Sequence, residues 1–527
     1  FGGVVGSMLP IEIVISILTL SLPVTMLGGA CLSATRAGWP LAQAAAVLGL
    51  LGTLAAATLT WATAEVARGD PYSASELLSG SPVSLAVAVL VAFLAWVILR
   101  YSHNYLRGEP GQARYLAMLQ LTVAAVALVI LTDHLLVLAG AWVSISLGLH
   151  QLLLFYPNRP RAVLAAHKKF LLARTAEACL LGAVALLWSE HHTWQISAIL
   201  SDLADRDLTT GETVAAVLLA VVALVKCAQL PVHGWLIQVV EAPTPVSALL
   251  HAGIINLGGY LLILFAPLFA KATAAQWLVL VVGGLSAVLA GLVTLTRVSI
   301  KVKLAWSTCA QMGLMLVECA LGLFDLALLH LIAHACYKAH GFLNSGSNVL
   351  QDLVRRMAPA SASLLRDWLV AAAVGAALVG LAAAAVYDGG PLSPWLLVLV
   401  MLTLVIGGLR RGVGLLQIEP VLWAAVLLSG YLLQKLGSGL LVAPLQTTAG
   451  PAADGWVVLI VLLMTAGYVW LRAFPHNAVS RRLWVWLFAA FYLDEWVTRT
   501  TMRLWPQPLP APVRSKRLPE SYQEIAP

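Results

Sequence analysis

Three titratable side chains follow one another at four-residue spacing inside the apolar segment LALLHLIAHACYKAHGFL: His330, His334 and Lys338. On an α-helix this spacing places them on one face, about 6 Å apart along the axis. Two histidines at i and i+4 can bind zinc, but no third ligand accompanies them and Lys338 would repel a cation. The pattern therefore favours a proton path through a membrane, with ordinary core packing as the alternative.

A second candidate site centres on Lys226, which stands in the apolar run VVALVKCAQLPVHGW. Pro231 follows five residues later and is predicted to break the helix. Broken helices at membrane depth form wet ion sites in transporters, and a desolvated lysine readily releases its proton. We expect Lys226 to load and release a proton, because snorkelling is disfavoured more than ten residues from either end of its apolar run. His251, two turns into the next run, is predicted to join this path unless it is a neutral packed ring.

Other ionisable residues in or beside apolar runs are candidates for supporting roles. Arg174 and Glu177 are three residues apart, so they can form an ion pair on one helix face. Lys435 is either a further proton station or a lysine that snorkels from a helix end. The remaining candidate path or modulating residues are Asp133, Glu241, Lys303 and Glu318.

The composition explains why these few residues stand out. The 527-residue chain is 10% charged and 60% apolar, with a mean hydropathy of +0.89, whereas soluble domains are about 25% charged. A chain with so few charges is neither a soluble enzyme nor intrinsically disordered, and we expect it to lie in a lipid bilayer. The six cysteines form no C-x-x-C pair, and no nucleotide- or haem-binding motif occurs. We therefore expect no catalytic residue, metal or cofactor in this chain.

The apolar runs predict an all-α polytopic membrane protein with about 15 transmembrane helices. They fall at 10–32, 40–63, 82–100, 114–131, 134–156, 167–188, 213–238, 245–266, 276–296, 302–323, 325–348, 367–386, 394–409, 416–441 and 455–471. Four parts are predicted: N-terminal helices 1–80, a core 81–357, divergent helices 358–472 and a cytoplasmic tail 473–527.

Alternate loops differ sharply in basic charge. One side carries nineteen lysines and arginines and the other carries three, Arg68, Arg206 and Lys271. The positive-inside rule then places the C-terminus in the cytoplasm and the N-terminus in the periplasm of a bacterial inner membrane. The same rule accounts for the net charge of +7 without a nucleic-acid partner.

The segment 483–505 mixes charge with aromatic residues and predicts one interfacial amphipathic helix against membrane lipid. Residues in this helix are also candidates for docking a cytosolic partner: Asp494, Glu495, Trp496 and Arg499. The proline-rich residues after it are read either as a disordered end or as a docking strap.

The segment KCAQLPVHGW…EAPTPVSALLHAG (226–253) resembles the signature of the antiporter-like subunits. This family comprises the large proton-translocating subunits of respiratory complex I and the Mrp cation/proton antiporters. SIKVKLAWST (299–308), HLIAHACYKAHGFL (330–343) and RTAE (174–177) resemble further family blocks. The resemblance implies two inverted five-helix repeats containing broken helices. It also implies that Lys226 is the proton-loading lysine, that His251 and the 330–338 stripe form the relay, and that Glu241 lies in the family's loop.

Two positions depart from the family. Val143, after Trp142, stands where the family has a glutamate that partners the loading lysine. Glu177 and Asp133 are the candidates to replace that carboxylate. Beyond residue 357 the Pro-rich block of the twelfth span, with its exit-side lysine, is not recognisable.

These departures, with the tail FYLDEWVTR, resemble the membrane subunits of inorganic-carbon accumulation complexes, a branch of this family. The resemblance implies a subunit that conducts protons or Na⁺ and so drives one-way CO2 hydration. The zinc is then expected on a cytoplasmic partner resembling a β-carbonic anhydrase, and a dimer of heterodimers is left open. The alternatives are a proton-translocating subunit of a complex I or Mrp-type assembly, and a membrane scaffold with inert buried histidines.

Overall fold

The computed structural model describes residues 11–66, 73–75, 77–203, 206–346, 365–386, 393–409, most of 421–432, and 450–506. These residues form helices apart from turns and a short ribbon of β1 (Ser73–Ser75) and β2 (Leu78–Ser79). The predicted all-helical, multi-pass architecture is confirmed at this level.

The helices occur in three groups along the chain. The first comprises α1 (Ile11–Cys31), α2 (Gly38–Val66), α3 (Pro82–Tyr105), α4 (Gln112–Leu131), α5 (Leu135–Leu153), α6 (Pro160–His191) and α7 (Ile196–Asp202). The second comprises α8 (Thr210–Lys226), α9 (Gly234–Gln238), η1 (Val239–Glu241), α10 (Thr244–Ala252), η2 (Ile254–Asn256), α11 (Leu257–Leu264), α12 (Ala266–Lys271), α13 (Thr273–Leu295), α14 (Ile300–Ala320) and α15 (Phe324–Leu343). The third comprises α17 (Leu365–Val386), α18 (Ser393–Leu409), α20 (Pro451–Ala473), α21 (Ala478–Phe488), η3 (Ala490–Tyr492) and α22 (Glu495–Leu504).

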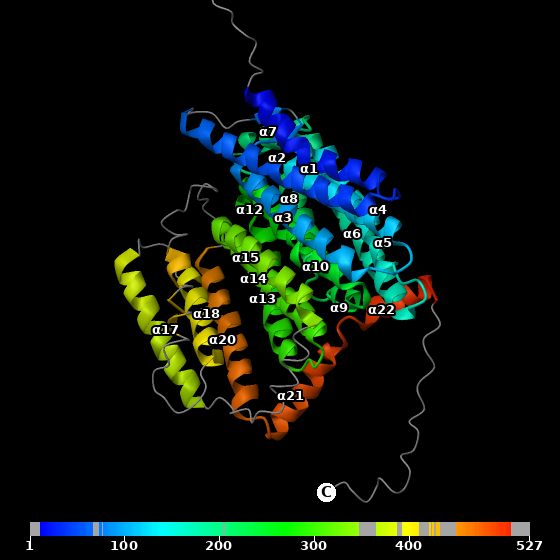
Figure 1. Ribbon diagram of the computed structural model, residues 1–527. Coiled ribbons are helices and arrows are strands. Elements are labelled where there is room, and N and C mark those ends of the chain that lie inside the picture. The colour runs from blue at the N-terminus through cyan, green and yellow to red at the C-terminus, as the bar shows by residue number, and fades with distance from the viewer. Residues whose placement is uncertain are drawn as a thin grey trace, which may run out of the picture.

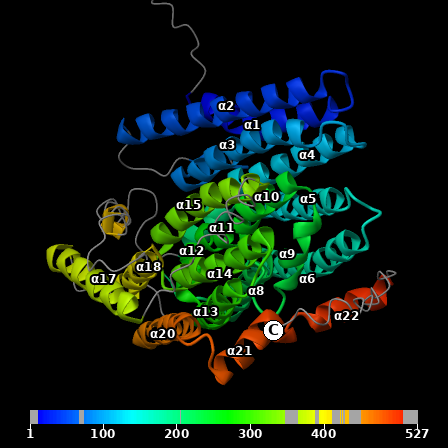
Figure 2. The ribbon, with the colours of Figure 1, turned by 60° about the horizontal axis from the view of Figure 1, so that its bottom comes forward.

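The second group forms the centre of the molecule. Figures 1 and 2 show it between the blue helices α1–α4 and the yellow-to-orange helices α17, α18 and α20. Within it α13 packs on α14 and α8, and α15 packs on α10, α11 and α14. The last two helices, α21 and α22, run as a red arm across one end of this bundle from α20 to α6 (Figure 1).

Ten of the described helices are long and apolar enough to cross a membrane. Four more, α8, α14, α15 and α18, coincide with predicted spans but lie outside that set. The number fifteen therefore stays a prediction. Most of the predicted span 416–441, including Lys435, lies outside the described residues.

Two predicted spans are not continuous helices. The run 213–238 divides into α8 and α9, with Ala228 at φ +52° in the intervening segment, which contains Pro231. The run 245–266 divides at Gly253 into α10 and α11, joined by the single 3-10 turn η2. The span at 367–386 corresponds to α17, which is unbroken. The two breaks described here lie in consecutive predicted spans. The inverted-repeat symmetry that the family resemblance implies stays a prediction.

The predicted single amphipathic helix at 483–505 is wrong in its continuity. It is divided into α21 and α22 by η3, where Ala490, Phe491 and Tyr492 have φ values near +50°. The reason is tertiary: Leu487 of α21 inserts between α13 and α14, whereas α22 packs on α6. The chain must turn between these two sites.

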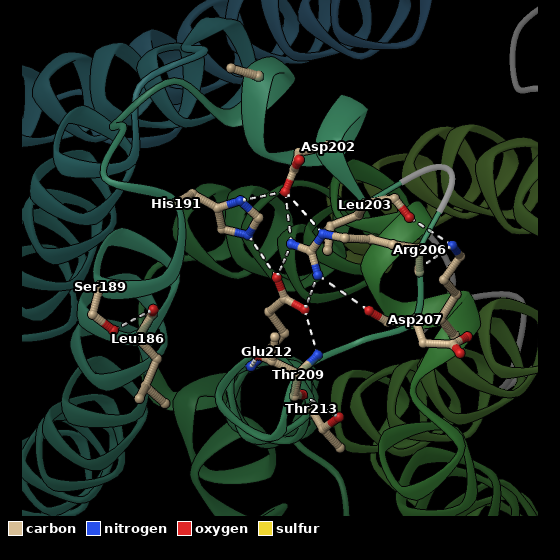
Figure 3. Close-up of polar contacts among 12 residues, drawn as sticks. Leu186, Ser189, His191, Asp202, Leu203, Arg206, Asp207, Thr209, Glu212 and Thr213 are labelled. Atoms are coloured by element: carbon tan, nitrogen blue, oxygen red, sulfur yellow. Dashed lines mark hydrogen bonds and ion pairs between the residues drawn. The ribbon is translucent and has the colours of Figure 1, made fainter.

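At the end of the bundle opposite the arm, four charged or titratable side chains interlock (Figure 3). His191 lies between two carboxylates, with Nδ1 3.1 Å from Asp202 and Nε2 3.0 Å from Glu212. Arg206 donates to the same two carboxylates at 2.7 and 2.6 Å. Through them the ends of α6, α7 and α8 are held together.

Lys271 and Thr209 extend this cluster of four side chains. Lys271 donates to the carbonyl of Leu203 at 2.6 Å and to that of Arg206 at 2.9 Å, which attaches α12. Thr209 caps α8 in a reciprocal capping box with Glu212. The basic residues Arg206 and Lys271 of the predicted periplasmic side therefore lie together at one end of the bundle.

Arg206 determines the ionisation of both carboxylates. Its hydrogen bonds lower the pKa of Asp202. Burial by itself raises the pKa of Glu212, but Arg206 and the N–H of Thr209 outweigh it, so that this pKa is also lowered. Carboxylates with lowered pKa values stabilise the folded state only while they remain ionised.

We expect Arg206→Gln to lower the melting temperature at pH 7 and to have a smaller effect at about pH 3. The stabilisation is fully present above the unfolded pKa values of about 4 and is lost as the pH falls through the lowered folded values. Thermal unfolding in detergent at both pH values measures this. Arg107→Gln, an exposed arginine elsewhere, is the control. An equal loss of stability at both pH values would contradict the assignment.

Candidate ion-conducting axis

The titratable stripe of α15 faces the interior of the bundle. His334 is 4% exposed and Lys338 is fully buried, while His330 is partly buried. The four-residue spacing therefore does place these groups along one buried helix face, against α10, α11 and α14. A buried polar group must find partners, and each of the three finds them on a neighbouring helix.

The Lys338 end of the stripe is held by one turn of α14. Lys338 donates to the carbonyl of Leu304 at 3.1 Å and to the hydroxyl of Ser307. His251 of α10 contacts Thr308, with Nδ1 3.3 Å from the hydroxyl oxygen, and its ring stacks on an aromatic ring of α15. Ser307 and Thr308 were not singled out in the sequence, because hydroxyl side chains carry no signal that separates a site from packing.

The middle of the stripe meets the second helix break. His334 Nδ1 lies 3.2 Å from the side-chain oxygen of Asn256, in η2. Asn256 in turn donates to the carbonyl of Ala252 at 2.7 Å, at the end of α10. The break therefore supplies the residue that orients His334.

His251 and His334 share a further property. Each ring has its Nδ1 engaged, whereas its buried Nε2 has no hydrogen-bond partner among the described residues. Neutral imidazole carries one donor and one acceptor nitrogen, so fixing one leaves the other free to exchange a proton with water. This arrangement suits proton transfer better than permanent packing.

The stripe ends at a carboxylate. His330 Nδ1 lies 3.0 Å from Glu318 of α14, and its Nε2 lies 3.0 Å from the side-chain oxygen of Gln311. The short connection from α14 to α15 brings Glu318 and His330 face to face, twelve residues apart in sequence. Glu318 was predicted only as a supporting residue, and its pairing could not be read from one helix alone.

Lys226 lies in a separate cluster at the end of α8. Its ammonium is 4.6 Å from the ring centroid of Trp142 on α5, a cation–π distance. The carboxylate whose charge acts on Lys226 is Glu177, which is almost fully buried and paired with Arg174 at 2.7 Å. The Trp142 ring and Glu177 thus act on Lys226 where the family's neighbouring glutamate is replaced by Val143.

Lys169 of α6 belongs to the same cluster and was missed. It is buried and donates to the carbonyl and hydroxyl of Ser146 at 2.7 and 3.1 Å. Arg174 also donates to the Ser146 hydroxyl, at 3.1 Å. The pattern of apolar runs places Lys169 at the edge of a predicted span, among the basic residues of the cytoplasmic side. Its position near the start of α6, beside apolar residues, was the available signal. We call the set Lys226, Trp142, Glu177, Arg174, Lys169 and Ser146 the Lys226 cluster.

The remaining predicted residues lie elsewhere. Asp133 accepts hydrogen bonds from the N–H and hydroxyl of Ser197 at 2.9 and 2.5 Å, at the start of α7, and so serves as a helix cap. Glu241 and Lys303 are exposed.

On the arm, Glu495, Trp496 and Arg499 are exposed, whereas Asp494 pairs with Lys168 of the same chain. Within the described residues, no group of three or more His, Cys, Asp or Glu side chains is placed to hold a metal ion.

Two family models match the chain. The model described as "NADH:quinone oxidoreductase/Mrp antiporter, TM" matches residues 132–361, which contain the Lys226 cluster and the titratable stripe of α15. The model described as "NADH-Ubiquinone oxidoreductase (complex I), chain 5 N-terminus" matches residues 72–116. The resemblance to the antiporter-like subunits is thereby confirmed.

Nearly the full length of the chain aligns with a protein named probable inorganic carbon transporter subunit DabB, from Hydrogenovibrio crunogenus. The two are 49% identical over 514 residues, which is 96% of this chain and 98% of that protein. The chain belongs to the DabB family. A second member, DabB2 of Halothiobacillus neapolitanus, is 37% identical over 81% of this chain and 80% of its own length. By contrast, subunit L of the Escherichia coli NADH-quinone oxidoreductase matches 51% of the chain and 44% of its own length, at 34% identity.

Solved structures show the same fold. The chain aligns with a chain of the Mrp complex from Dietzia sp. at a TM-score of 0.55 and 22% identity, covering 96% of this chain and 59% of that one. It aligns with a chain of the archaeal membrane-bound sulfane sulfur reductase at a TM-score of 0.55 and 17% identity, covering 93% and 99%. At these identities the likeness concerns fold alone, which the DabB family shares with antiporter-like subunits.

The Lys226 cluster depends on one carboxylate, so Glu177→Gln is expected to destabilise the chain. Three cations then lack their counter-charge, and the loss is on the order of 1–3 kcal/mol, reduced because Arg174 is about one-third exposed. Thermal unfolding in detergent measures the loss, with the exposed Glu109→Gln as the control. A wild-type melting temperature for Glu177→Gln would remove Glu177 from this role.

Proposed function

We propose that this chain is the cation-conducting membrane subunit of an inorganic-carbon accumulation complex. In this proposal, protons (or Na⁺) cross the bilayer along the Lys226 cluster and the stripe of α15. Their movement drives one-way hydration of CO2 to bicarbonate by a cytoplasmic zinc partner, a DabA-like protein resembling a β-carbonic anhydrase. The chemistry resides on the partner, so this chain itself is not an enzyme.

The observation that carries the proposal is the buried polar axis itself. Titratable groups are expensive to bury and persist in membrane helices where they serve a path or a site. Here His251, His334 and Lys338 lie inside the bundle, bonded to side chains and a carbonyl of α14 and η2.

The surroundings of Lys226 suit a proton-loading group. Glu177 and the face of Trp142 favour the charged ammonium, whereas burial away from water disfavours it. Such opposed effects leave the two protonation states close in energy, so that a small rearrangement at the break after α8 can change which one prevails. The proton released from Lys226 would then enter the relay of His251 and His334.

The likeness to a DabB protein over 96% of the chain supports the carbon-accumulation role over the alternative. A proton-translocating subunit of complex I or of an Mrp-type assembly remains the second candidate, because subunit L matches half of the chain. For the DabB-like role we infer a bacterial inner-membrane location with the arm on the cytoplasmic face, where a zinc partner would dock. A dimer of heterodimers is one arrangement that such a complex could take.

A replacement of the loading lysine separates proton transfer from fixed charge. Lys226→Arg keeps the charge but cannot release it, so we expect it to abolish bicarbonate uptake as completely as Lys226→Ala. His334→Gln should have the same effect, whereas the exposed His340→Gln on the same helix should leave uptake intact. Uptake of labelled bicarbonate, with expression levels matched, measures this. Normal uptake in Lys226→Arg would refute proton loading at this residue.

A second experiment tests the partner. Purification of the tagged chain from its native membrane is expected to bring a zinc protein with it, in a fixed ratio of zinc to chain measured by elemental analysis. A zinc-free assembly that oxidises NADH would instead support the complex I alternative and overturn the carbon-accumulation role.

A further inference from the structure

The arm formed by α21, η3 and α22 binds its own chain at two places. Near the end of α21, the Leu487 carbonyl accepts a hydrogen bond from Arg297 at 3.4 Å. The Arg297 guanidinium lies 5.2 Å from the ring of Trp306 on one side and 5.2 Å from Phe488 on the other. This contact fastens α21 to the connection between α13 and α14.

The second place is a buried ion pair. Lys168 of α6, whose side chain is fully buried, pairs with the carboxylate of Asp494 and donates to the hydroxyl of Thr498 at 2.8 Å. Gly234, the first residue of α9, lies directly against the same carboxylate, and a Cβ at this position would clash with Asp494 Oδ2. We call Lys168, Asp494 and Gly234 the arm clamp.

The two faces of α22 differ in what they contact. Asp494, Val497 and Thr501 lie at i, i+3 and i+7, on one helix face, and Val497 and Thr501 are buried against the bundle. Trp496 and Arg499 are exposed on the other side. The inward face is thus committed to the chain's own core, and only the outward face is free for a partner.

The arm clamp joins α6, which contributes to the Lys226 cluster, to α9, which follows the helix break after Lys226. Lys168 is adjacent to Lys169, which belongs to the Lys226 cluster through Ser146. Gly234 begins α9, on the far side of the helix break that starts directly after Lys226. One carboxylate therefore contacts both α6 and the restart of the broken helix.

The energetics favour a firm contact. A buried lysine charge needs a counter-charge, and removal of one partner from a buried pair is strongly destabilising because the other charge remains. Among the contacts described above, the contact between Asp494 and Gly234 is the one that joins the α22 end of the arm to the segment after the break. The segment after the break also packs directly on α6, so displacement of the carboxylate would remove one link between them and loosen this contact.

We propose that Asp494 is a positioning residue for the Lys226 cluster: by binding Lys168 and packing on Gly234, it holds the helix break closed beside Lys226. This inference rests on the proposed role of Lys226 as the loading group. It assigns the arm a part in the ion site itself, in addition to any docking through its exposed face. A partner that moves α22 would thereby change the surroundings of Lys226.

The natural Cys227 provides a direct test, because it follows Lys226 and is fully buried. In Asp494→Asn we expect alkylation of Cys227 by a thiol reagent, followed by mass spectrometry, to accelerate about tenfold, the factor that corresponds to ~1.4 kcal/mol of lost closure. Gly234→Ala should do the same without removing a charge.

Two internal controls accompany this measurement. Glu495→Gln alters the exposed face of the same helix and should leave Cys227 labelling at the wild-type rate. Cys319 lies at the C-terminal end of α14 and is fully buried. It reports global unfolding and should stay unlabelled in every variant.

The outcomes separate this inference from the proposed function. Unchanged Cys227 labelling in Asp494→Asn would overturn the positioning role, even if bicarbonate uptake fell, because the arm would then act only through docking. Labelling of Cys227 and Cys319 together would overturn it as well, since it would reveal general unfolding. Faster labelling of Cys227 alone, with normal uptake, supports the positioning role and counts instead against Lys226 as the loading group.

Discussion

The cost of burying positive charge in an apolar bundle is the constraint on which the rest of this structure depends. Several buried cations near the axis are balanced by very few acidic groups, whereas Lys338 is held by a carbonyl and a hydroxyl of α14. Glu177 serves Lys226 and Arg174, and Asp494 serves Lys168. Because each acid serves a separate site, the sites can respond separately, and none is satisfied by solvent alone.

The helix breaks convert that constraint into geometry. A continuous helix satisfies all its backbone groups internally and leaves none for a path. The break after Lys226 and the turn at Asn256 interrupt consecutive spans, and each brings a polar group beside a titratable one. Asn256 orients His334, and Gly234 admits Asp494 where any Cβ would exclude it. Strict packing at these two points therefore determines where charge can reside in the membrane.

Much of the fold was accessible from local pattern alone. Helical segments agree with the apolar runs to within a few residues at α3, α13 and α20, because a membrane helix needs a length of apolar sequence that few other structures need. The buried face of α15 followed from four-residue spacing. The continuity of the tail did not follow, because Leu487 and Asp494 contact elements nearly two hundred or more residues away in sequence.

By itself, the sequence determined the membrane class, the positions of most described helices and the family. It also singled out Lys226, His251, His334 and Lys338, since a titratable residue in an apolar run is conspicuous without any structure. Only the tertiary structure decided the partners: Asp133 bonded to Ser197, Glu318 against His330, and Asp494 turned inward to Lys168. The physical reason is that charge interactions depend on distance in space. Helix packing brings together residues that no spacing along the chain relates.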